Sequence, residues 1–370
     1  MNRRKMLTGA AMITLPGMAR ARGWDKAGLE QAARLMDSFV ADGRVQGASI
    51  LVKRIDADGM DVFSRNFGTA KGTEPIFLLA SITKPMAAAV VMTLVDEGKL
   101  SLDDTVTKFF PVFTGDGRET ITVRNLLTHT GGLPDMLAND EMLREEKAGL
   151  DVFRDGALKA PLKFKPGTSY SYASMGILLA SAIAEKVTGK PIADLADERL
   201  FKPLKMTRTS FGLRGRPNSQ AVPSQPAPAM TPAGKLSWQN WNWNSEYWRN
   251  LGAPWGGALG SAADIVKFYD EFLNKRGKVV KPATAGLMIT NQSPPGVRAS
   301  GLGFDLPPAV GSPGCSARTF GHNGSTGTLS WADPENGVTC VVLTTLYESA
   351  MRPHPTHQVS DKISEALHKG

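Results

Sequence analysis

Ala80-Ser81-Ile82-Thr83-Lys84-Pro85-Met86 opens an apolar run that continues as Ala87-Ala88-Ala89-Val90-Val91-Met92-Thr93-Leu94-Val95. A run that is apolar on every side predicts a buried helix. Because proline is tolerated only in the first turn of a helix, Pro85 places the start near Ser81 or Ile82. We expect the helix to end near Gly98. The sequence therefore puts a serine hydroxyl at the N-terminus of a buried helix.

Ser81 and Lys84 are three residues apart, so their side chains share one face of this helix, with Cβ atoms about 5–6 Å apart. The positive N-terminus of a helix stabilises an oxyanion, and burial lowers the pKa of a lysine. A serine beside a neutral lysine is a nucleophile with a base. The Ser-x-x-Lys spacing is common, so the remaining sequence has to decide whether this pair is functional.

The order of the other predicted elements indicates the fold class. Periodicity and turn residues predict helices over 25–41, 103–110, 122–128, 172–187, 192–200, 262–274 and 357–368. They predict strands over 47–53, 61–66, 318–331 and 337–345, with a proline-rich loop over 214–236. This order predicts an α+β fold in which an antiparallel sheet from both chain ends is flanked by helices. An all-helical subdomain is expected within about residues 85–210.

Two further motifs carry candidate chemistry. Tyr172-Ala173-Ser174 stands at the start of a predicted helix, and a tyrosine becomes a plausible base only beside cations or a neutral lysine. His322-Asn323-Gly324-Ser325 lies on a predicted strand between other glycines. Glycine weakens a strand unless something must approach the backbone, and a substrate carbonyl that needs an N–H donor is such a group.

These three motifs, in this order and spacing, resemble the penicillin-recognising serine hydrolases. That superfamily includes class C β-lactamases, D-Ala-D-Ala carboxypeptidases and related carboxylesterases. Further segments are similar to the same superfamily, and the likeness covers about residues 30–350. They are Asp96-Glu97-Gly98-Lys99-Leu100, Leu102-Asp103-Asp104, Ile121 to Thr130, Pro166-Gly167-Thr168, Val187 to Pro191, Gly256-Gly257 and Ser261-Ala262-Ala263-Asp264.

The resemblance implies a β-lactamase-like fold over residues 24–370 and a role for each motif. Ser81 would be the acylated nucleophile, and Lys84 and Tyr172 would share the proton transfers in a way that the sequence leaves open. The backbone N–H groups of Ser81 and Ser325 would form the oxyanion hole. A further set would contact substrate, namely Ser174, His322, Asn323 and Gly324.

Two residues depart from the pattern of the superfamily. Ser174 replaces the usual asparagine, which typically holds the amide of a peptide or β-lactam side chain, and His322 replaces a common lysine. Histidine supplies no permanent charge at neutral pH. Both changes weaken the case for an efficient β-lactamase or for a substrate that ends in a carboxylate.

Tryptophans gather shortly before Gly256-Gly257. Five of the seven tryptophans fall within residues 238–255. They could simply pack in the core or in loops, because aromatic side chains bury large areas. Alternatively Trp243, Trp248 and Trp255 form an apolar wall beside the site, which would favour hydrophobic acyl groups.

Residues 1–21 predict an export signal. Arg3-Arg4-Lys5 is followed by a short apolar segment and by Ala19-Arg20-Ala21, an A-x-A cleavage site, and the paired arginines are typical of the twin-arginine type. We therefore expect a periplasmic location after cleavage behind Ala21. Removing the segment lowers the formal net charge from +8 to +4, and no basic run indicates nucleic-acid binding.

The expected function is therefore that of an exported serine hydrolase that acts on esters or amides through an acyl-enzyme on Ser81. Alternatives are a D-Ala-D-Ala carboxypeptidase or β-lactamase, or a penicillin-binding sensor that is acylated without turnover. We expect a small-molecule or peptide substrate and no cofactor, metal site, nucleic-acid partner or transmembrane span. The sequence leaves open the oligomeric state and whether Cys315 and Cys340 pair.

Overall fold

Segments from the two ends of the chain meet in one five-stranded antiparallel sheet in the computed structural model, which describes residues 25–56, 59–225 and 241–368. The strand order is β2-β1-β8-β7-β6. In chain order the strands are β1 (Gly47–Asp56), β2 (Gly59–Gly68), β6 (Phe320–Gly324), β7 (Thr328–Asp333) and β8 (Val338–Thr344). β1 and β8 pair from Ala48↔Thr344 to Arg54↔Val338, which joins the N-terminal hairpin to the C-terminal strands.

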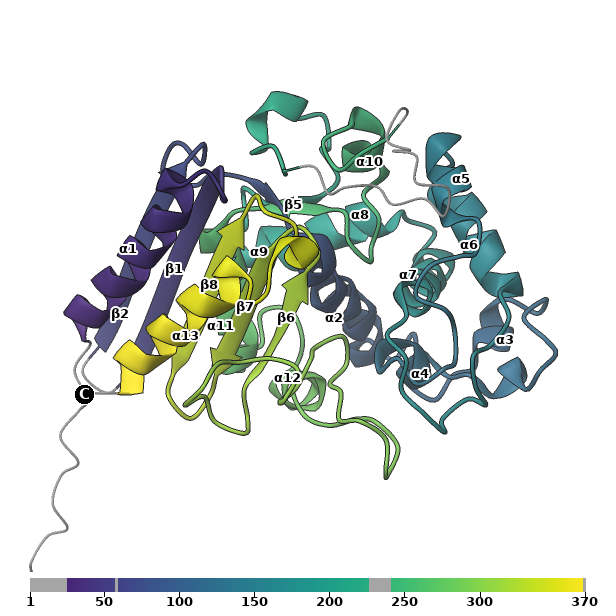
Figure 1. Ribbon diagram of the computed structural model, residues 1–370. Helices are drawn as coiled ribbons and strands as arrows, with labels where there is room; N and C mark the ends of the chain where they lie inside the picture. Colours follow the sequence, from purple (N-terminus) through teal and green to yellow (C-terminus); the bar gives the residue numbers. More distant parts are fainter. Residues whose placement is uncertain (1–24, 57–58, 226–240, 369–370) are drawn as a thin grey trace, which may run out of the picture.

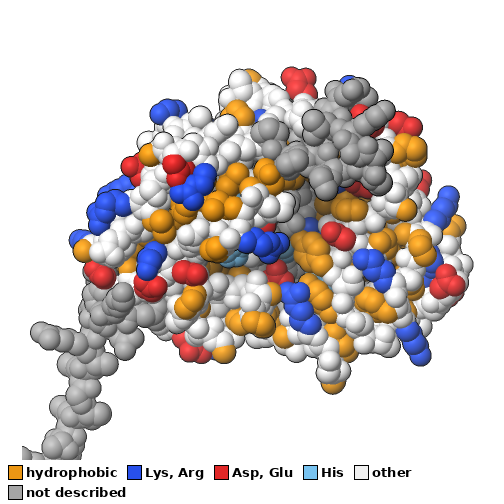
Figure 2. All heavy atoms as spheres, viewed as in Figure 1, with side chains coloured by type: hydrophobic (Ala, Val, Ile, Leu, Met, Phe, Trp, Pro, Cys, Tyr) orange, Lys and Arg blue, Asp and Glu red, His pale blue; other side chains and the backbone are white. Residues whose placement is uncertain are grey.

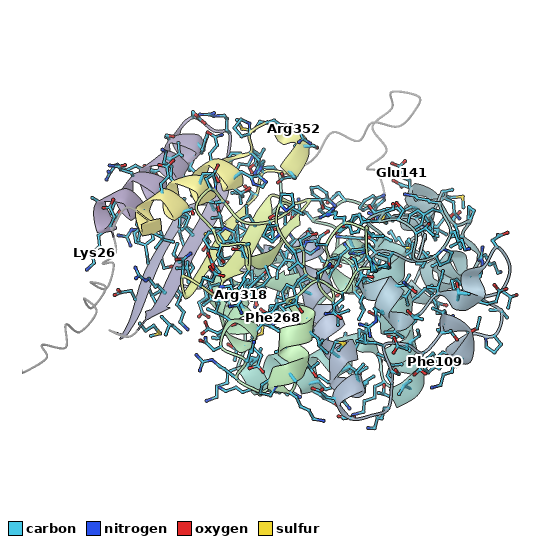
Figure 3. All side chains as sticks on the ribbon, turned by 90° about the horizontal axis from the view of Figure 1, so that it is seen from below. Lys26, Phe109, Glu141, Phe268, Arg318 and Arg352 are labelled. Carbon is cyan, nitrogen blue, oxygen red and sulfur yellow. The ribbon has the colours of Figure 1, made fainter. Side chains whose placement is uncertain are left out.

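Helices cover both faces of this sheet. α1 (Lys26–Ala41) and α13 (Pro355–His368) lie side by side on one face (Figures 1 and 3). α11 (Ala262–Leu273) packs on the other face against β1, β7 and β8. The apolar residues of α1 recur at helical spacing, and the buried ones face the core: Leu29, Ala32, Ala33, Met36 and Phe39.

The helical part of the molecule lies beside the sheet, with α2 (Thr83–Asp96) between them (Figure 1). α2 is buried along almost its whole length and packs against α7 (Ser174–Thr188). The other helices are α3 (Val106–Phe109), α4 (Val123–Leu127), α5 (Asp140–Glu145), α6 (Leu150–Lys159), α8 (Ile192–Ala196), α9 (Lys202–Leu204), α10 (Glu246–Leu251) and α12 (Pro282–Met288).

A small second sheet holds the chain just before α2. Its strand order is β3-β5-β4, formed by β3 (Phe77–Leu78), β5 (Ala258–Gly260) and β4 (Ser210–Phe211). A 3₁₀ turn over Ala80–Ile82 connects β3 to α2 and contacts β6 and β7 of the large sheet. Ser81 therefore stands where the two sheets and the helical part meet.

The predicted α+β class and the sheet built from both chain ends are confirmed. One strand prediction is wrong, because the single strand expected over 318–331 is two strands, β6 and β7. A tight turn separates them, and Gly327 in this turn has φ +76°, a backbone conformation that glycine adopts without strain. The Gly-Ser-Thr-Gly sequence over 324–327 was the available signal.

Other boundaries shift by a few residues. The helix expected over 192–200 is regular only to Ala196 and continues as a π-helical turn over Asp197–Phe201. Both cysteines, Cys315 and Cys340, are free thiols. In the described part of the chain no helix is both long enough and apolar enough to cross a bilayer. The predicted export segment lies outside the described residues, as do residues 226–236 of the predicted loop.

A nearly buried ion pair joins β1 to α11 and supplies a test of this packing. Lys53 contacts the carboxylate of Asp270, and both side chains are about nine-tenths buried. We expect Lys53→Met to lower the free energy of unfolding by about 3 kcal/mol, since it leaves a buried carboxylate without its main partner. Removing one partner of a buried ion pair usually costs about 3–5 kcal/mol. We expect the lower end of this range because Arg276 lies 3.8 Å from the same carboxylate.

Urea unfolding would measure this loss, and the double variant Lys53→Met/Asp270→Asn is the matched control. The double variant should recover most of the stability, because it also removes the Asp270 charge, which the single variant leaves buried without its partner. A loss below about 1 kcal/mol in the single variant would show that the pair is not a buried charge contact.

Candidate active site

Ser81 is held rigidly by the turn that precedes α2. Ala80 has φ +47°, a left-handed conformation that is costly for a residue with a Cβ atom. The Thr83 hydroxyl donates to Ala80 O (2.6 Å) and accepts from Ala258 N (3.0 Å), so it ties the turn to β5. These contacts fix the Ser81 backbone while its side chain reaches a cavity.

Lys84 contacts the Ser81 hydroxyl directly. Its Nζ donates to Ser81 Oγ (3.0 Å) and to the carbonyl oxygen of Trp255 (2.7 Å). The side chain is buried, and this burial lowers the pKa of Lys84 to about 7, against the opposing fields of two carboxylates, Asp135 and Asp305. A large share of Lys84 is therefore uncharged near neutral pH, as the sequence argument required.

Tyr172 completes the group around Ser81. Lys84 Nζ lies 4.6 Å from the centroid of its ring. Burial raises the pKa of the Tyr172 phenol well above its ordinary value, and a hydrogen bond with Ser81 lowers it by less. The phenol therefore keeps its proton at neutral pH and is a hydrogen-bond donor in the resting site.

His129, which could be mistaken for a member of a serine–histidine pair, lies behind Tyr172. Its ring centroid is 4.8 Å from that of Tyr172, and its Nδ1 accepts a hydrogen bond from Ala173 N (3.2 Å). Burial lowers the pKa of His129 well below its usual range, so the ring is neutral. Its contacts position the Tyr172 segment.

The turn after β6 brings Ser325 to the cavity of Ser81. Thr326 Oγ1 donates to Leu78 O (2.7 Å), and Thr328 Oγ1 donates to Leu79 O (2.8 Å). Gly324 has to be glycine, because a Cβ atom there would lie 2.5 Å from Leu79 O. Ser81 and Ser325 line the same cavity, which is the placement that the predicted oxyanion pair requires.

His322 is placed behind the cavity wall. The lining that the described residues form contains neither His322 nor its neighbours Asn323 and Gly324. The ring of His322 lies 5.9 Å from that of Tyr172, its Nδ1 is 2.7 Å from Asn323 O, and its Nε2 is 3.8 Å from an Asp305 oxygen. Burial lowers the pKa of His322 although Asp305 opposes this. Substrate contacts by these three residues stay a prediction.

Ser174 lines the cavity, but its polar groups are occupied. Its hydroxyl donates to Asp135 Oδ1 (2.6 Å), and its backbone N–H donates to the same oxygen (3.0 Å). Asp135 thereby caps the start of α7. The hydroxyl at the position of the usual asparagine therefore has a partner within the protein.

The cavity has a volume of about 270 Å³ and an aromatic side. All three predicted wall residues line it, namely Trp243, Trp248 and Trp255. The face shown in Figure 2 is hollowed near its middle, where histidine, basic and hydrophobic side chains meet. The lining also includes residues that sequence reasoning did not identify, among them Leu78, Asp135, Met136, Arg144 and Thr326.

Arg144 enters the lining from α5 and is neutralised there. Its guanidinium lies over the rings of Trp241 (4.6 Å) and Trp248 (4.5 Å) and pairs with Asp140 (2.8 Å). No motif in the sequence pointed to Arg144. Asp135 lies five residues beyond the segment Ile121 to Thr130, the nearest part of the sequence with a likeness to the superfamily, and no motif included it.

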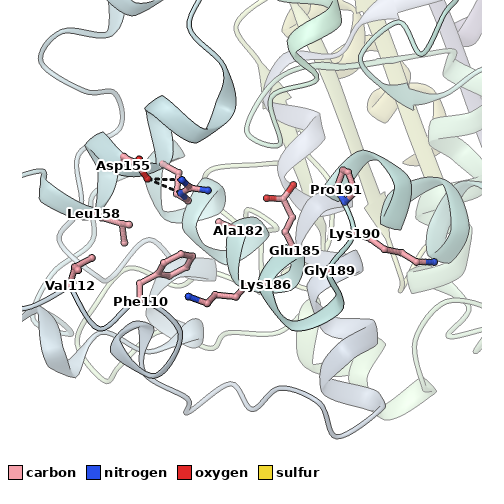
Figure 4. Close-up of a pocket in the computed structure, with 11 residues that line it drawn as sticks. Phe110, Val112, Asp155, Leu158, Ala182, Glu185, Lys186, Gly189, Lys190 and Pro191 are labelled. Carbon is pink, nitrogen blue, oxygen red and sulfur yellow. Dashed lines mark hydrogen bonds and ion pairs between the residues drawn. The ribbon is translucent and has the colours of Figure 1, made fainter.

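A larger hollow of about 700 Å³ lies away from Ser81, between α6 and α7 (Figure 4). Its charged groups are already engaged: Arg154 pairs with Asp155, Lys190 pairs with Glu198, and Lys186 lies over Phe110. It brings together no nucleophile and base. Among the described residues no cluster of His, Cys, Asp and Glu is suited to hold a metal ion.

Comparison with known proteins agrees with this geometry. Residues 32–361 match the family model described as Beta-lactamase. This chain belongs to the β-lactamase family. Members of the β-lactamase family are serine hydrolases, among them esterases, amidases and carboxypeptidases, so the chain is a serine hydrolase.

Individual relatives in the β-lactamase family differ in their reactions. Esterase EstB of Burkholderia gladioli is 33% identical over 222 residues, which are 53% of this chain and 56% of the esterase. A putative D-alanyl-D-alanine carboxypeptidase of Escherichia coli K12 is 27% identical over 84% of this chain and 81% of its own. The structure of a D-amino acid amidase from Ochrobactrum anthropi SV3 superposes with a TM-score of 0.74 at 22% identity, covering 92% of this chain and 99% of the amidase.

Titration of Lys84 tests the electrostatics of the site. In protein that carries ¹³C at the lysine ε-carbons, we expect the Lys84 resonance to shift with a midpoint near pH 7, because burial opposes its charge. Exposed lysines should titrate near pH ~10.4. The Lys84→Arg variant identifies the resonance by its loss. A midpoint above pH 9 for this resonance would contradict a desolvated amine.

Proposed function

We propose that this protein is an exported serine hydrolase that forms an acyl-enzyme on Ser81 and hydrolyses esters or amides of small acyl groups. The observation that carries the proposal is the 3.0 Å contact between Lys84 Nζ and Ser81 Oγ, with the pKa of Lys84 lowered to about 7 by burial. A base that is neutral at working pH is what a serine nucleophile needs.

The pKa directions of Lys84 and Tyr172 support one division of the proton transfers that the sequence left open. Neutral Lys84 takes the proton of Ser81 as Oγ attacks the carbonyl carbon, and the backbone N–H groups of Ser81 and Ser325 stabilise the oxyanion. The Tyr172 phenol gives its proton to the leaving oxygen or nitrogen, and Lys84 then gives the proton that it took from Ser81 to the Tyr172 oxygen. The net change moves one proton from Ser81 to the leaving group, and both auxiliary groups return to their resting forms.

Deacylation runs the same transfers with water as the nucleophile. Water loses a proton to neutral Lys84 while it attacks the acyl carbon. Ser81 Oγ leaves and regains a proton. Hydrolysis should therefore weaken below pH ~7, where Lys84 is protonated.

The cavity favours small acyl groups over peptides or β-lactams. Its volume of about 270 Å³ is at the small end of ligand pockets, which span ~300–1,000 Å³. The Ser174 hydroxyl is engaged by Asp135, which leaves it poorly placed to hold an amide. Arg144 is paired with Asp140, so it offers little to a terminal carboxylate. The relation to esterase EstB points the same way.

Intact-mass and turnover measurements test the acyl-enzyme with three substrates: 4-nitrophenyl butyrate, a chromogenic cephalosporin and a D-Ala-D-Ala peptide. We expect product from the ester, together with a butyryl mass adduct on Ser81 in a rapidly quenched sample. Ser81→Ala should abolish both signals. Tyr172→Phe should lower kcat by about 10²–10⁴-fold, the usual contribution of a general acid or base.

The outcomes separate the alternative functions. A stable cephalosporin adduct on Ser81 without product would indicate a penicillin-binding sensor, and turnover of the peptide alone would indicate a carboxypeptidase. Ester hydrolysis that survives in Ser81→Ala protein would contradict the proposed nucleophile.

Export is tested separately by cell fractionation of the full chain expressed in a Gram-negative host. We expect periplasmic protein whose N-terminus begins after Ala21, since Arg3-Arg4 and Ala19-Arg20-Ala21 form a signal of the twin-arginine type. Replacing Arg3 and Arg4 by Lys-Lys should retain the protein in the cytoplasm. Cytoplasmic protein with an intact N-terminus in the unaltered chain would overturn the proposal of export.

A further inference from the structure

One carboxylate lines the active-site cavity without a positive partner. Asp135 uses a single oxygen, Oδ1, for both of its hydrogen bonds to Ser174. No hydrogen bond or ion pair to its second oxygen, Oδ2, is found among the described residues. Asp135 lies close enough to Lys84 and Tyr172 for its charge to influence both.

The cations of the lining do not neutralise this charge. Arg144 is ion-paired with Asp140 and stacked on indole rings. Lys84 is buried and gives its hydrogen bonds to Ser81 and Trp255. With Lys84 uncharged and the charge of Arg144 balanced by Asp140 next to the lining, the charge that remains at the cavity is that of Asp135. Such a cavity attracts a cation and repels an anionic acyl group.

The aromatic wall suits the same kind of ligand. Trp243 and Trp255 line the cavity together with Asp135, while the ring of Trp248, which also lines it, is stacked against Arg144. The face of an indole ring attracts an ammonium group, and more strongly where water is excluded. A carboxylate and indole rings in one small cavity are the groups that recognise an alkylammonium with a short apolar body.

We propose that Asp135 selects substrates whose acyl group carries a protonated amine, so that the preferred substrates are aminoacyl esters or amides. This inference rests on the proposed function, because it places the amine on the acyl side of the bond that Ser81 cleaves. Ser81 Oγ bonds to the acyl carbon, the bond to the leaving group breaks, and the leaving group receives the Ser81 proton through Lys84 and Tyr172. The ammonium keeps its own proton and binds Asp135 throughout.

The direct test compares kcat/KM for methyl esters that differ only in the amine. The substrates are the methyl esters of D- and L-alanine and methyl propanoate, assayed at pH ~7, where about half of Lys84 is uncharged and an α-amine of pKa ~7.7–8.0 is still mostly protonated. We expect at least about a tenfold preference for one or both alanine esters, as for a hydrogen bond to a charged group. Asp135→Asn should remove this preference.

The Asp135→Asn variant suits this test because asparagine can still accept the two hydrogen bonds from Ser174 with its side-chain oxygen. The variant also removes the field of Asp135 at Lys84, which a bound ammonium already offsets in the unaltered enzyme. The ratio of kcat/KM values therefore reports amine recognition together with this field, and the binding measurement below reports recognition alone. Glu141→Gln is the matched control, since Glu141 is an exposed residue of α5 outside the cavity lining. It should leave the preference unchanged.

A binding measurement separates this inference from the proposed reaction. Calorimetry on Ser81→Ala protein would compare the dissociation constants of 2-phenylethylammonium and 2-phenylethanol. This measurement needs no catalysis. We expect the ammonium to bind at least about tenfold more tightly, and the double variant Ser81→Ala/Asp135→Asn to lose this difference.

Each outcome has one meaning. Hydrolysis of methyl propanoate with no preference for the alanine esters, or a preference that survives Asp135→Asn, overturns the amine site and leaves the serine hydrolase proposal intact. Ammonium binding that depends on Asp135, without acylation of Ser81 by any ester, supports the amine site and overturns the proposed reaction. If Glu141→Gln removes the preference for the alanine esters to the same extent, the assignment of the amine site to Asp135 is also overturned.

Discussion

The active site depends on the burial of one lysine amine between two oxygen acceptors. Lys84 Nζ reaches Ser81 Oγ and Trp255 O, and protein surrounds it. An isolated ammonium in such a place would cost several kcal/mol, so the group responds by losing its proton. The apolar length of α2 is what makes this possible, because it places Lys84 in the interior. The helix that appears merely structural in the sequence therefore sets the protonation state of the base.

The two sheets and α2 are joined around this lysine by short polar contacts. The acceptor carbonyl of Trp255 comes from the segment that leads into β5, 171 positions from Lys84. Thr326 donates to Leu78 O in β3, 248 positions before it in the chain. Thr328 donates to the oxygen of the next residue, Leu79, 249 positions before it. Gly324 permits this approach because there is no space for a Cβ atom. A disturbance at any of these contacts would move the turn after β6, which carries Ser325, relative to Ser81.

Sequence reasoning succeeded where the signal was periodic or local. The apolar run of α2, the i, i+3 pair Ser81 and Lys84, and the α+β order of elements all followed from spacing and turn residues. It did not find what depends on distant pairing. The partner of Ser174 lies 39 positions away at Asp135, and Arg144 enters the cavity through the packing of α5 against tryptophans. His322 pairs with Ser330 of β7, and its ring lies 5.9 Å from that of Tyr172; the undivided strand prediction had missed this pairing.

Asp135 accepts two hydrogen bonds at the start of α7 with one oxygen, and the helix dipole favours its charge there, but its second oxygen takes no part in this contact. Its field favours the protonated form of Lys84, which acts against the role of Lys84 as a base, and burial has to overcome it. An ammonium bound to Asp135 would cancel this field, so Lys84 would be neutral in a larger fraction of the complex than of the free enzyme. A cationic acyl group would then be recognised and would strengthen the base that acts on it. A neutral or anionic acyl group would leave Asp135 opposed to the reaction, which gives the cavity selectivity in kcat as well as in binding.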